Sequence, residues 1–144
     1  ETYADALAFC DRPDPRHVTD AKFSLQHVVA VVMQRGAPQL EDFEPDAIAA
    51  LAEARGHISV VENSALTAAY PDHYGAVVRT PAGEVHLRDT LGDPERPLPA
   101  DELQQKAKAL MMWGGMDAAA AQEPVVYPRR SFFPSLVIKL SIIS

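Results

Sequence analysis

The sequence has very little cysteine, since Cys10 is the only one in 144 residues. A disulfide within the chain is therefore excluded, and so are an iron–sulfur cluster or a zinc site built on several cysteines. A single thiol is typical of a reducing compartment, and we expect a cytoplasmic protein. A basic, apolar leader and an initiator methionine are also lacking, so we expect a part of a longer protein.

Excess positive charge is lacking as well. Thirteen lysines and arginines face twenty acids, which gives a formal net charge of −7, and no stretch is rich in basic residues. This balance argues against a nucleic-acid partner. The apolar segment 131–144 is too short to span a bilayer and contains Lys139, so we expect no membrane partner either.

Close groups of metal ligands are the third absence. His57, His73 and His86 are far apart in the sequence and lack the His, Asp or Glu spacing of a metal site. We therefore expect no metal. An apolar content of 47% and a charged content of 23% are those of a single soluble globular domain.

The clearest helical pattern lies in residues 20–36. Its apolar residues recur with the spacing that lines one face of a helix, namely Leu25, Val28, Val29, Val32 and Met33. The pattern ends at Arg35 and Gly36. A cation in the last turn followed by a glycine is a common ending of a helix.

The beginning of this helix is polar. Either Asp20 or Ser24 can cap it, and with Ser24 as the cap Lys22 would lie in the loop before the helix, free to approach His27. In both cases Lys22, Ser24 and His27 gather where a helix presents free N–H groups. Such a combination suits a carboxylate or a phosphate.

The rest of the chain predicts a small α+β domain, with helices packed on one side of a mostly antiparallel sheet. Residues 1–11 fit a strand or a short helix, and residues 58–61 a short strand. Val85 and Leu87 alternate with polar residues in a hairpin that turns at Pro81-Ala82-Gly83. Further helices are expected over 45–56, beginning at Pro45, and over 100–113.

The segment Ala21-Lys22-Phe23-Ser24-Leu25-Gln26-His27 resembles the AKFS-type motif of the MmgE/PrpD family, which includes 2-methylcitrate dehydratase and cis-aconitate decarboxylase. The elements that follow the motif agree in order, down to Pro97-Leu98-Pro99-Ala100-Asp101-Glu102-Leu103 before the last helix. The resemblance covers about residues 12–115. We expect residues 1–122 to form the family's C-terminal lid domain, truncated at its N-terminal side, and residues 123–144 to be a divergent tail. One departure is Ala107, which follows Lys106 in the last helix, where the family usually has a phenylalanine.

The resemblance implies a cofactor-independent lyase, a dehydratase or decarboxylase, that acts on a small di- or tricarboxylate. Lys22 and His27 match positions that line the family's cleft, which makes them the expected catalytic residues, with Lys22, Ser24 and His27 binding substrate. The expected partner is an all-helical N-terminal domain, without which the chain would be inactive. The resemblance also implies a homodimer at full length and a role in propionate catabolism. The alternative is a truncated remnant or association domain without activity of its own.

Overall fold

The structure, a computed structural model, describes residues 1–122, which fall into two compact units that divide after Leu91. The predicted tail 123–144 lies outside the described residues. None of the helices within residues 1–122 combines the length and the apolar character that crossing a bilayer requires.

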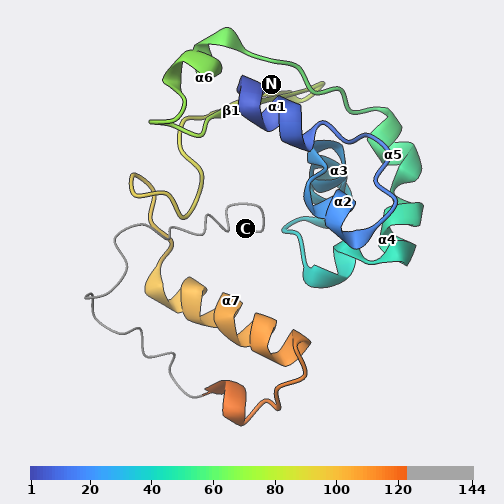
Figure 1. The fold of residues 1–144 in the computed structure, drawn as a ribbon, viewed down its shortest axis with the longest axis vertical. Coiled ribbons are helices and arrows are strands. Elements are labelled where there is room, and N and C mark those ends of the chain that lie inside the picture. The colour runs from blue at the N-terminus through green and yellow to red at the C-terminus, as the bar shows by residue number, and fades with distance from the viewer. Residues whose placement is uncertain (123–144) are drawn as a thin grey trace. The chain divides into compact units, whose positions relative to one another are not determined.

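The first unit contains six α-helices, one 3-10 helix and a β-hairpin (Figure 1). The helices are α1 (Ala4–Cys10), α2 (Val18–Lys22), α3 (Leu25–Arg35), η1 (Leu40–Phe43), α4 (Pro45–Ala50), α5 (Ala52–Gly56) and α6 (Ser64–Ala69), and the strands are β1 (Ala76–Thr80) and β2 (Gly83–Leu87). Helices α2 to α5 pack together, with α3 against α2 and α5. The ambiguous segment at the start is thus a helix, and the predicted proline start of α4 is confirmed.

Ser24 separates α2 from α3, so the later of the two predicted starts is the one observed. Its side chain accepts a hydrogen bond from the backbone N–H of His27 at 3.0 Å, which satisfies a donor that has no partner inside the helix. Lys22 does not lie in a loop, because it is the last residue of α2. Helix α3 ends at Gly36, whose φ of 89° is a conformation that glycine adopts without steric cost.

The face of α3 that packs into the core is not the apolar stripe expected from the sequence. The buried residues are Gln26, His27, Ala30 and Val31, whereas Val32 is 50% exposed and Met33 65% exposed. Two clusters form the core: Ala21, Phe43 and Ile48 in one, and Ala30, Val31 and Leu51 in the other. Of the predicted stripe, Val28 packs against the first cluster, whereas Val32 and Met33 remain exposed.

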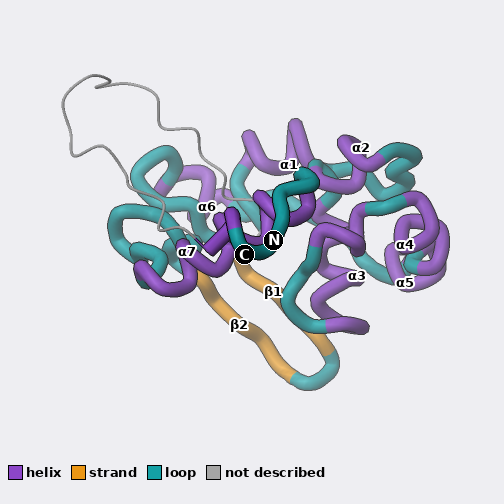
Figure 2. The backbone as a smooth tube through the Cα atoms, turned by 90° about the horizontal axis from the view of Figure 1, so that it is seen from below, coloured by secondary structure: helices purple, strands orange, loops and turns teal. Residues whose placement is uncertain are grey.

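The predicted hairpin is present, with a tighter turn than expected. Strands β1 and β2 form an antiparallel hairpin (Figure 2). Thr80 pairs with Gly83 across a turn of Pro81 and Ala82. Val77 is buried, but every residue of β2 is exposed, so the predicted dry face of Val85 and Leu87 is wrong for the described part of the chain.

Two further segments differ from the expectation. Residues 58–61 form no strand, although Glu62 makes an isolated parallel bridge with Thr2. Helix α6 was not predicted, because its apolar run is short. Its cap was nevertheless visible in the sequence, since Asn63 accepts hydrogen bonds from the N–H groups of Ala65 and Leu66.

In the second unit, helix α7 (Ala100–Trp113) has the predicted bounds. The two glycines after it end the helix as predicted: the N–H of Gly115 bonds to Met112 and that of Met116 to Met111, with a φ of 94° at Gly115. A 3-10 helix, η2 (Ala120–Gln122), follows. Helices together with an antiparallel pair of strands confirm the predicted α+β class.

The Ser24 cap predicts a measurable loss of stability on substitution. Ser24 is 1% exposed, and its hydroxyl also donates to the carbonyl of Arg12 at 2.5 Å. We expect Ser24→Ala to lower the free energy of unfolding by about 2 kcal/mol in urea denaturation, because a cap and a buried hydrogen bond are both lost. Ser64→Ala is the matched control, since Ser64 is exposed and Asn63 provides the cap of its helix. Equal stability of the two variants would contradict the assignment.

Candidate functional site

The candidate site lies at the junction of α2 and α3, where Lys22, Ser24 and His27 were predicted to meet. Ser24 and His27 are brought together by the capping hydrogen bond. Both are buried, with 1% and 0% of their surface exposed. The hydroxyl of Ser24 is engaged as donor and as acceptor, so the cap and the Arg12 carbonyl occupy it.

His27 is held through both nitrogens of its ring. Nε2 lies 2.7 Å from the carbonyl oxygen of Asp42, and Nδ1 lies 3.2 Å from Nη1 of Arg55. A carbonyl can only accept and a guanidinium can only donate, so Nε2 carries the proton and Nδ1 is the acceptor. The ring of Phe43 contacts the imidazole edge-on, with centroids 5.7 Å apart. The neutral tautomer is therefore the one that this environment fits.

Burial lowers the pKa of His27 below its ordinary value, and the neighbouring charge of Arg55 lowers it further, although the bond to Asp42 acts in the opposite direction. Arg55 is itself 4% exposed and donates to the carbonyl of Ile48 at 2.5 Å. Burial lowers the pKa of Arg55 too. An arginine nevertheless remains charged at neutral pH, so a second proton on His27 would face a fixed cation.

Asp42 anchors the other side of the imidazole. Its Oδ1 accepts from Arg35 at 2.7 Å and its Oδ2 from the N–H of Gln39 at 2.8 Å. Burial raises the pKa of Asp42, but the two hydrogen bonds outweigh burial, and the net shift is downward. Asp42 therefore stays ionised at neutral pH, and its position fixes the carbonyl that His27 contacts.

Lys22 differs from its two neighbours. It is half-buried at the end of α2, and no residue within the described range 1–122 bonds to its ammonium group. Nearby Arg12 is already paired with Asp20 at 3.0 Å and lies over the ring of Phe23. Among the described residues, Lys22 thus keeps all of its donors available to an anion, whereas Arg12 is already paired with a carboxylate.

A groove of about 610 Å³ also opens on the first unit, but it lies elsewhere. Its walls come from α3, from residues 57–60 and from β1, and it includes none of Lys22, Ser24 and His27. The predicted trio therefore does not share this hollow. The roles of these residues in binding or catalysis remain predictions.

Sequence reasoning missed the residues that hold His27. Arg55 is 28 positions away in the chain and Asp42 is 15 positions away, and neither belongs to a recognisable motif with the histidine. It also missed a second polar cluster, in which Nδ1 of His73 bonds to Asp89 at 2.6 Å and Nε2 lies 2.7 Å from Arg88. Within the described residues, no three His, Cys, Asp or Glu side chains come together as metal ligands would.

The burial of His27 predicts a dependence of stability on pH. The unfolded chain takes up a proton near the ordinary histidine pKa of about 6.5, whereas the folded protein takes it up only at lower pH. The free energy of unfolding should therefore fall as the pH drops below about 6.5, with a slope of at most about 1.4 kcal/mol per pH unit from this group.

His27→Gln isolates this contribution. Glutamine also offers an N–H for Asp42 and an oxygen for Arg55, but it does not titrate. We expect the variant to unfold cooperatively and its difference in stability from the parent to change between pH 7 and pH 5, as followed by urea denaturation. The other four histidines are common to both proteins and cancel in the difference. A difference that stays constant over this range would show that His27 is not buried as a neutral ring.

Comparison with known sequences identifies the family of this chain. A family model described as the MmgE/PrpD C-terminal domain matches residues 1–125. No curated protein and no solved structure matched the chain. The match spans most of the 144 residues, including α2, α3, the hairpin and α7. The chain therefore belongs to the MmgE/PrpD family, through a match to its C-terminal domain.

Proposed function

We propose that this chain is the C-terminal part of a cofactor-independent lyase, similar to 2-methylcitrate dehydratase, that acts on a small di- or tricarboxylate. The observation that carries the proposal is the family match over residues 1–125 together with a Lys22 that bonds to no other side chain or backbone group within residues 1–122. The family resemblance extends the proposal to a cytoplasmic enzyme of propionate catabolism that is a homodimer at full length.

Lys22 is the group best suited to bind a substrate carboxylate. Its ammonium has three donors and no partner among the described residues, and it precedes the first turn of α3 by only Phe23 and Ser24. The first N–H groups of a helix carry partial positive charge, which adds to the attraction of an anion. A side chain at the end of a short helix can also adjust its position without disturbing the core.

Ser24 and His27 support the site by a different route. We expect them to act as positioning residues, because both are buried and their polar atoms are engaged. Direct proton transfer by His27 would require the bond from Arg55 to break and a charge to form inside the core, which is unfavourable. The geometry therefore favours a role in which His27 fixes the helix start that carries Lys22.

This division of roles defines what the rest of the enzyme must supply. Dehydration next to a carboxylate needs a base that removes the α-proton and an acid that protonates the leaving hydroxyl. Negative charge develops on the carboxylate as the proton leaves. A cation such as Lys22 therefore stabilises the transition state more than it stabilises the ground state. The acid and the base would come from the helical N-terminal domain that the family resemblance implies.

Lys22→Met tests the proposed carboxylate contact, because methionine keeps an unbranched apolar stem and removes the charge. We expect citrate, used as the tricarboxylate probe, to bind the variant about tenfold more weakly than the parent, since a charge-assisted hydrogen bond is lost. Binding is measured by following backbone amide shifts in an NMR titration. The shifts are expected around Phe23 to Gln26.

Lys108→Met is the matched control. It removes the same charge from α7, which belongs to the second unit. Citrate affinity should be unchanged in this variant. If both variants bind citrate as the parent does, or if both are weakened equally, Lys22 makes no specific carboxylate contact.

The alternative function is a non-catalytic association domain, and exposed apolar side chains favour it. Phe9 is 67% exposed, Met33 65% and Val85 59%, and such side chains can become buried when a partner binds. This reading expects no dehydratase activity for the chain alone. Turnover of 2-methylcitrate by the purified chain, lost in Lys22→Met, would exclude it.

A further inference from the structure

Strand β2 uses one of its edges to pair with β1, and within residues 1–122 its outer edge is open. In a hairpin with a two-residue turn, the pair next to the turn exchanges hydrogen bonds, and bonded and non-bonded pairs alternate from there. Thr80 and Gly83 are the pair next to the turn, so Val85 directs its backbone groups to β1. Glu84 and His86 direct theirs outward, where they bond to no other described segment.

The bonds of Val77 agree with this alternation. Val77 lies opposite His86, and its N–H bonds to the carbonyl of Glu1 at 3.0 Å, on the side of β1 that faces away from β2. The hairpin therefore has two separate outer edges. The edge of β2 is an internal part of the chain, and among the described residues its donors and acceptors at Glu84 and His86 are unused.

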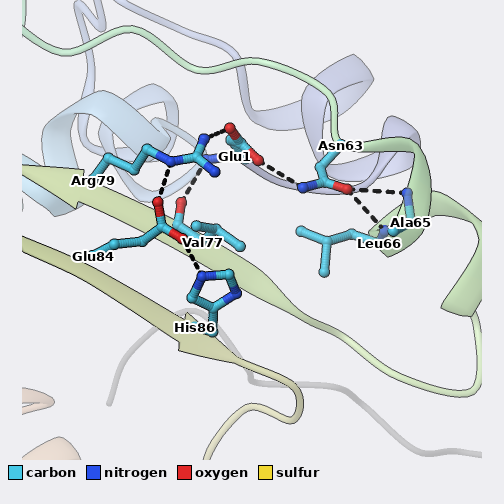
Figure 3. Close-up of polar contacts among 8 residues, drawn as sticks. All are labelled: Glu1, Asn63, Ala65, Leu66, Val77, Arg79, Glu84 and His86. Atoms are coloured by element: carbon cyan, nitrogen blue, oxygen red, sulfur yellow. Dashed lines mark hydrogen bonds and ion pairs between the residues drawn. The ribbon is translucent and has the colours of Figure 1, made fainter.

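The side chains of β2 are exposed and divide between two faces. On one face, the carboxylate of Glu84 accepts from both Arg79 and His86 (Figure 3). The bond to Arg79, and then that to His86, lower the pKa of Glu84, so this carboxylate is ionised at neutral pH. On the other face, Val85 is 59% exposed and lies opposite Val78, which is 39% exposed. The strand thus presents charge on one face and valine on the other.

We propose that the outer edge of β2 binds a second copy of this chain, whose own β2 pairs antiparallel with the first about a two-fold axis at Val85. In this register the outward-facing Glu84 of each copy lies opposite His86 of the other, and the two residues exchange both of their backbone hydrogen bonds. The same surface is used on both copies, as a two-fold interface requires. The two hairpins then form one continuous antiparallel sheet.

The side chains select this register. Residues directly opposite each other share a face, where opposite charges stabilise the pair and like charges destabilise it. An axis at Val85 sets each Glu84 against a histidine, whereas an axis at Glu84 would set two carboxylates against each other. An axis at His86 would set Glu84 against Arg88. However, Arg88 lies beyond the end of β2, and its Nη2 contacts Nε2 of His73 at 2.7 Å.

A second copy fits this edge because the edge is complementary to itself. It carries an acid and a basic ring two positions apart, and a two-fold axis between them presents the same two groups in reverse order. A carboxylate has about four acceptor sites, so Glu84 can keep Arg79 and also accept from the second histidine. On the other face, Val78 and Val85 continue into the same residues of the second copy. Their exposed apolar surface is thereby removed from water.

The test is the oligomeric state of the chain, measured by sedimentation over a range of concentrations. His86→Pro removes an outward N–H, and it leaves the hairpin intact because His86 does not bond to β1. His86→Thr is the matched control, since it removes the same ring and keeps the N–H. We expect the parent to dimerise and the proline variant to dimerise at least about tenfold more weakly than the threonine variant. A parent that is monomeric throughout, or equal dimerisation of the two variants, would overturn the proposal.

Charge at residue 86 tests the register. His86→Glu sets like charges opposite Glu84, and His86→Lys sets opposite charges there, while both variants keep the backbone groups. We expect the dissociation constant of the dimer to be about tenfold larger for the glutamate variant than for the lysine variant. The same two changes at His57, which is exposed and lies outside β2, control for the change in net charge. An equal ratio at both positions would show that Glu84 does not face residue 86 of a second copy.

A mixture of isotope-labelled and unlabelled chains locates the axis directly. We expect a nuclear Overhauser effect between the α-protons of Val85 in the two copies, because non-bonded pairs of an antiparallel ladder lie closest together. The amides of Glu84 and His86 should exchange more slowly with deuterium as concentration rises, and that of Val85 should not change. A dimer without these signals forms through another surface and contradicts the proposal. None of these measurements involves Lys22 or citrate, so their outcome is independent of the carboxylate site.

Discussion

The imidazole of His27 joins three segments of the first unit, and the packing of the α2–α3 junction depends on it. Its Nε2–H donates to the carbonyl of Asp42 in η1, and its Nδ1 accepts from Arg55 in α5. Because the ring is fully buried, each of these partners satisfies a polar atom that would otherwise cost about 1–3 kcal/mol to bury. The three segments are therefore held in one arrangement by directional bonds as well as by apolar contact.

This polar link matters because the apolar clusters around it are small. One contains Ala21, Phe43 and Ile48, and the other Ala30, Val31 and Leu51. Within residues 1–122, the largest fully buried side chains are those of Phe43, Leu51, His27, Val31 and Ser24, so a histidine and a serine are among them. Buried polar groups that are fully bonded specify a unique arrangement more strictly than apolar contact does. For the proposed lyase, which has to hold Lys22 against a carboxylate, such strictness at the helix that follows Lys22 is useful.

Local signals in the sequence predicted local structure well. The cap at Ser24, the proline start at Pro45, the glycines after α7 and the hairpin are decided by neighbouring residues, and all four are observed. The prediction of which face of α3 is buried was wrong because it rested on the spacing of apolar residues alone. The face that packs into the core contains Gln26 and His27. The buried orientation is stabilised by the contacts of His27 with Arg55 and Asp42, which lie far along the chain. A local sequence pattern therefore does not reveal it. For the same reason the trio at the helix start could be located in the sequence, but the burial of two of its members could not.

Within residues 1–122, the backbone N–H and C=O of Arg79 in β1 bond to no other segment, and this open strand edge has a consequence at high protein concentration. Unpaired N–H and C=O groups beside exposed valines form a template that any extended segment can join, including the same edge of another molecule. The charged side chains of Arg79 and Glu84 and the ring of Pro81 work against such stacking, since charge and proline are the usual protection of a sheet edge. We therefore expect self-association at this edge to increase with salt, because screening of the charges removes part of the protection.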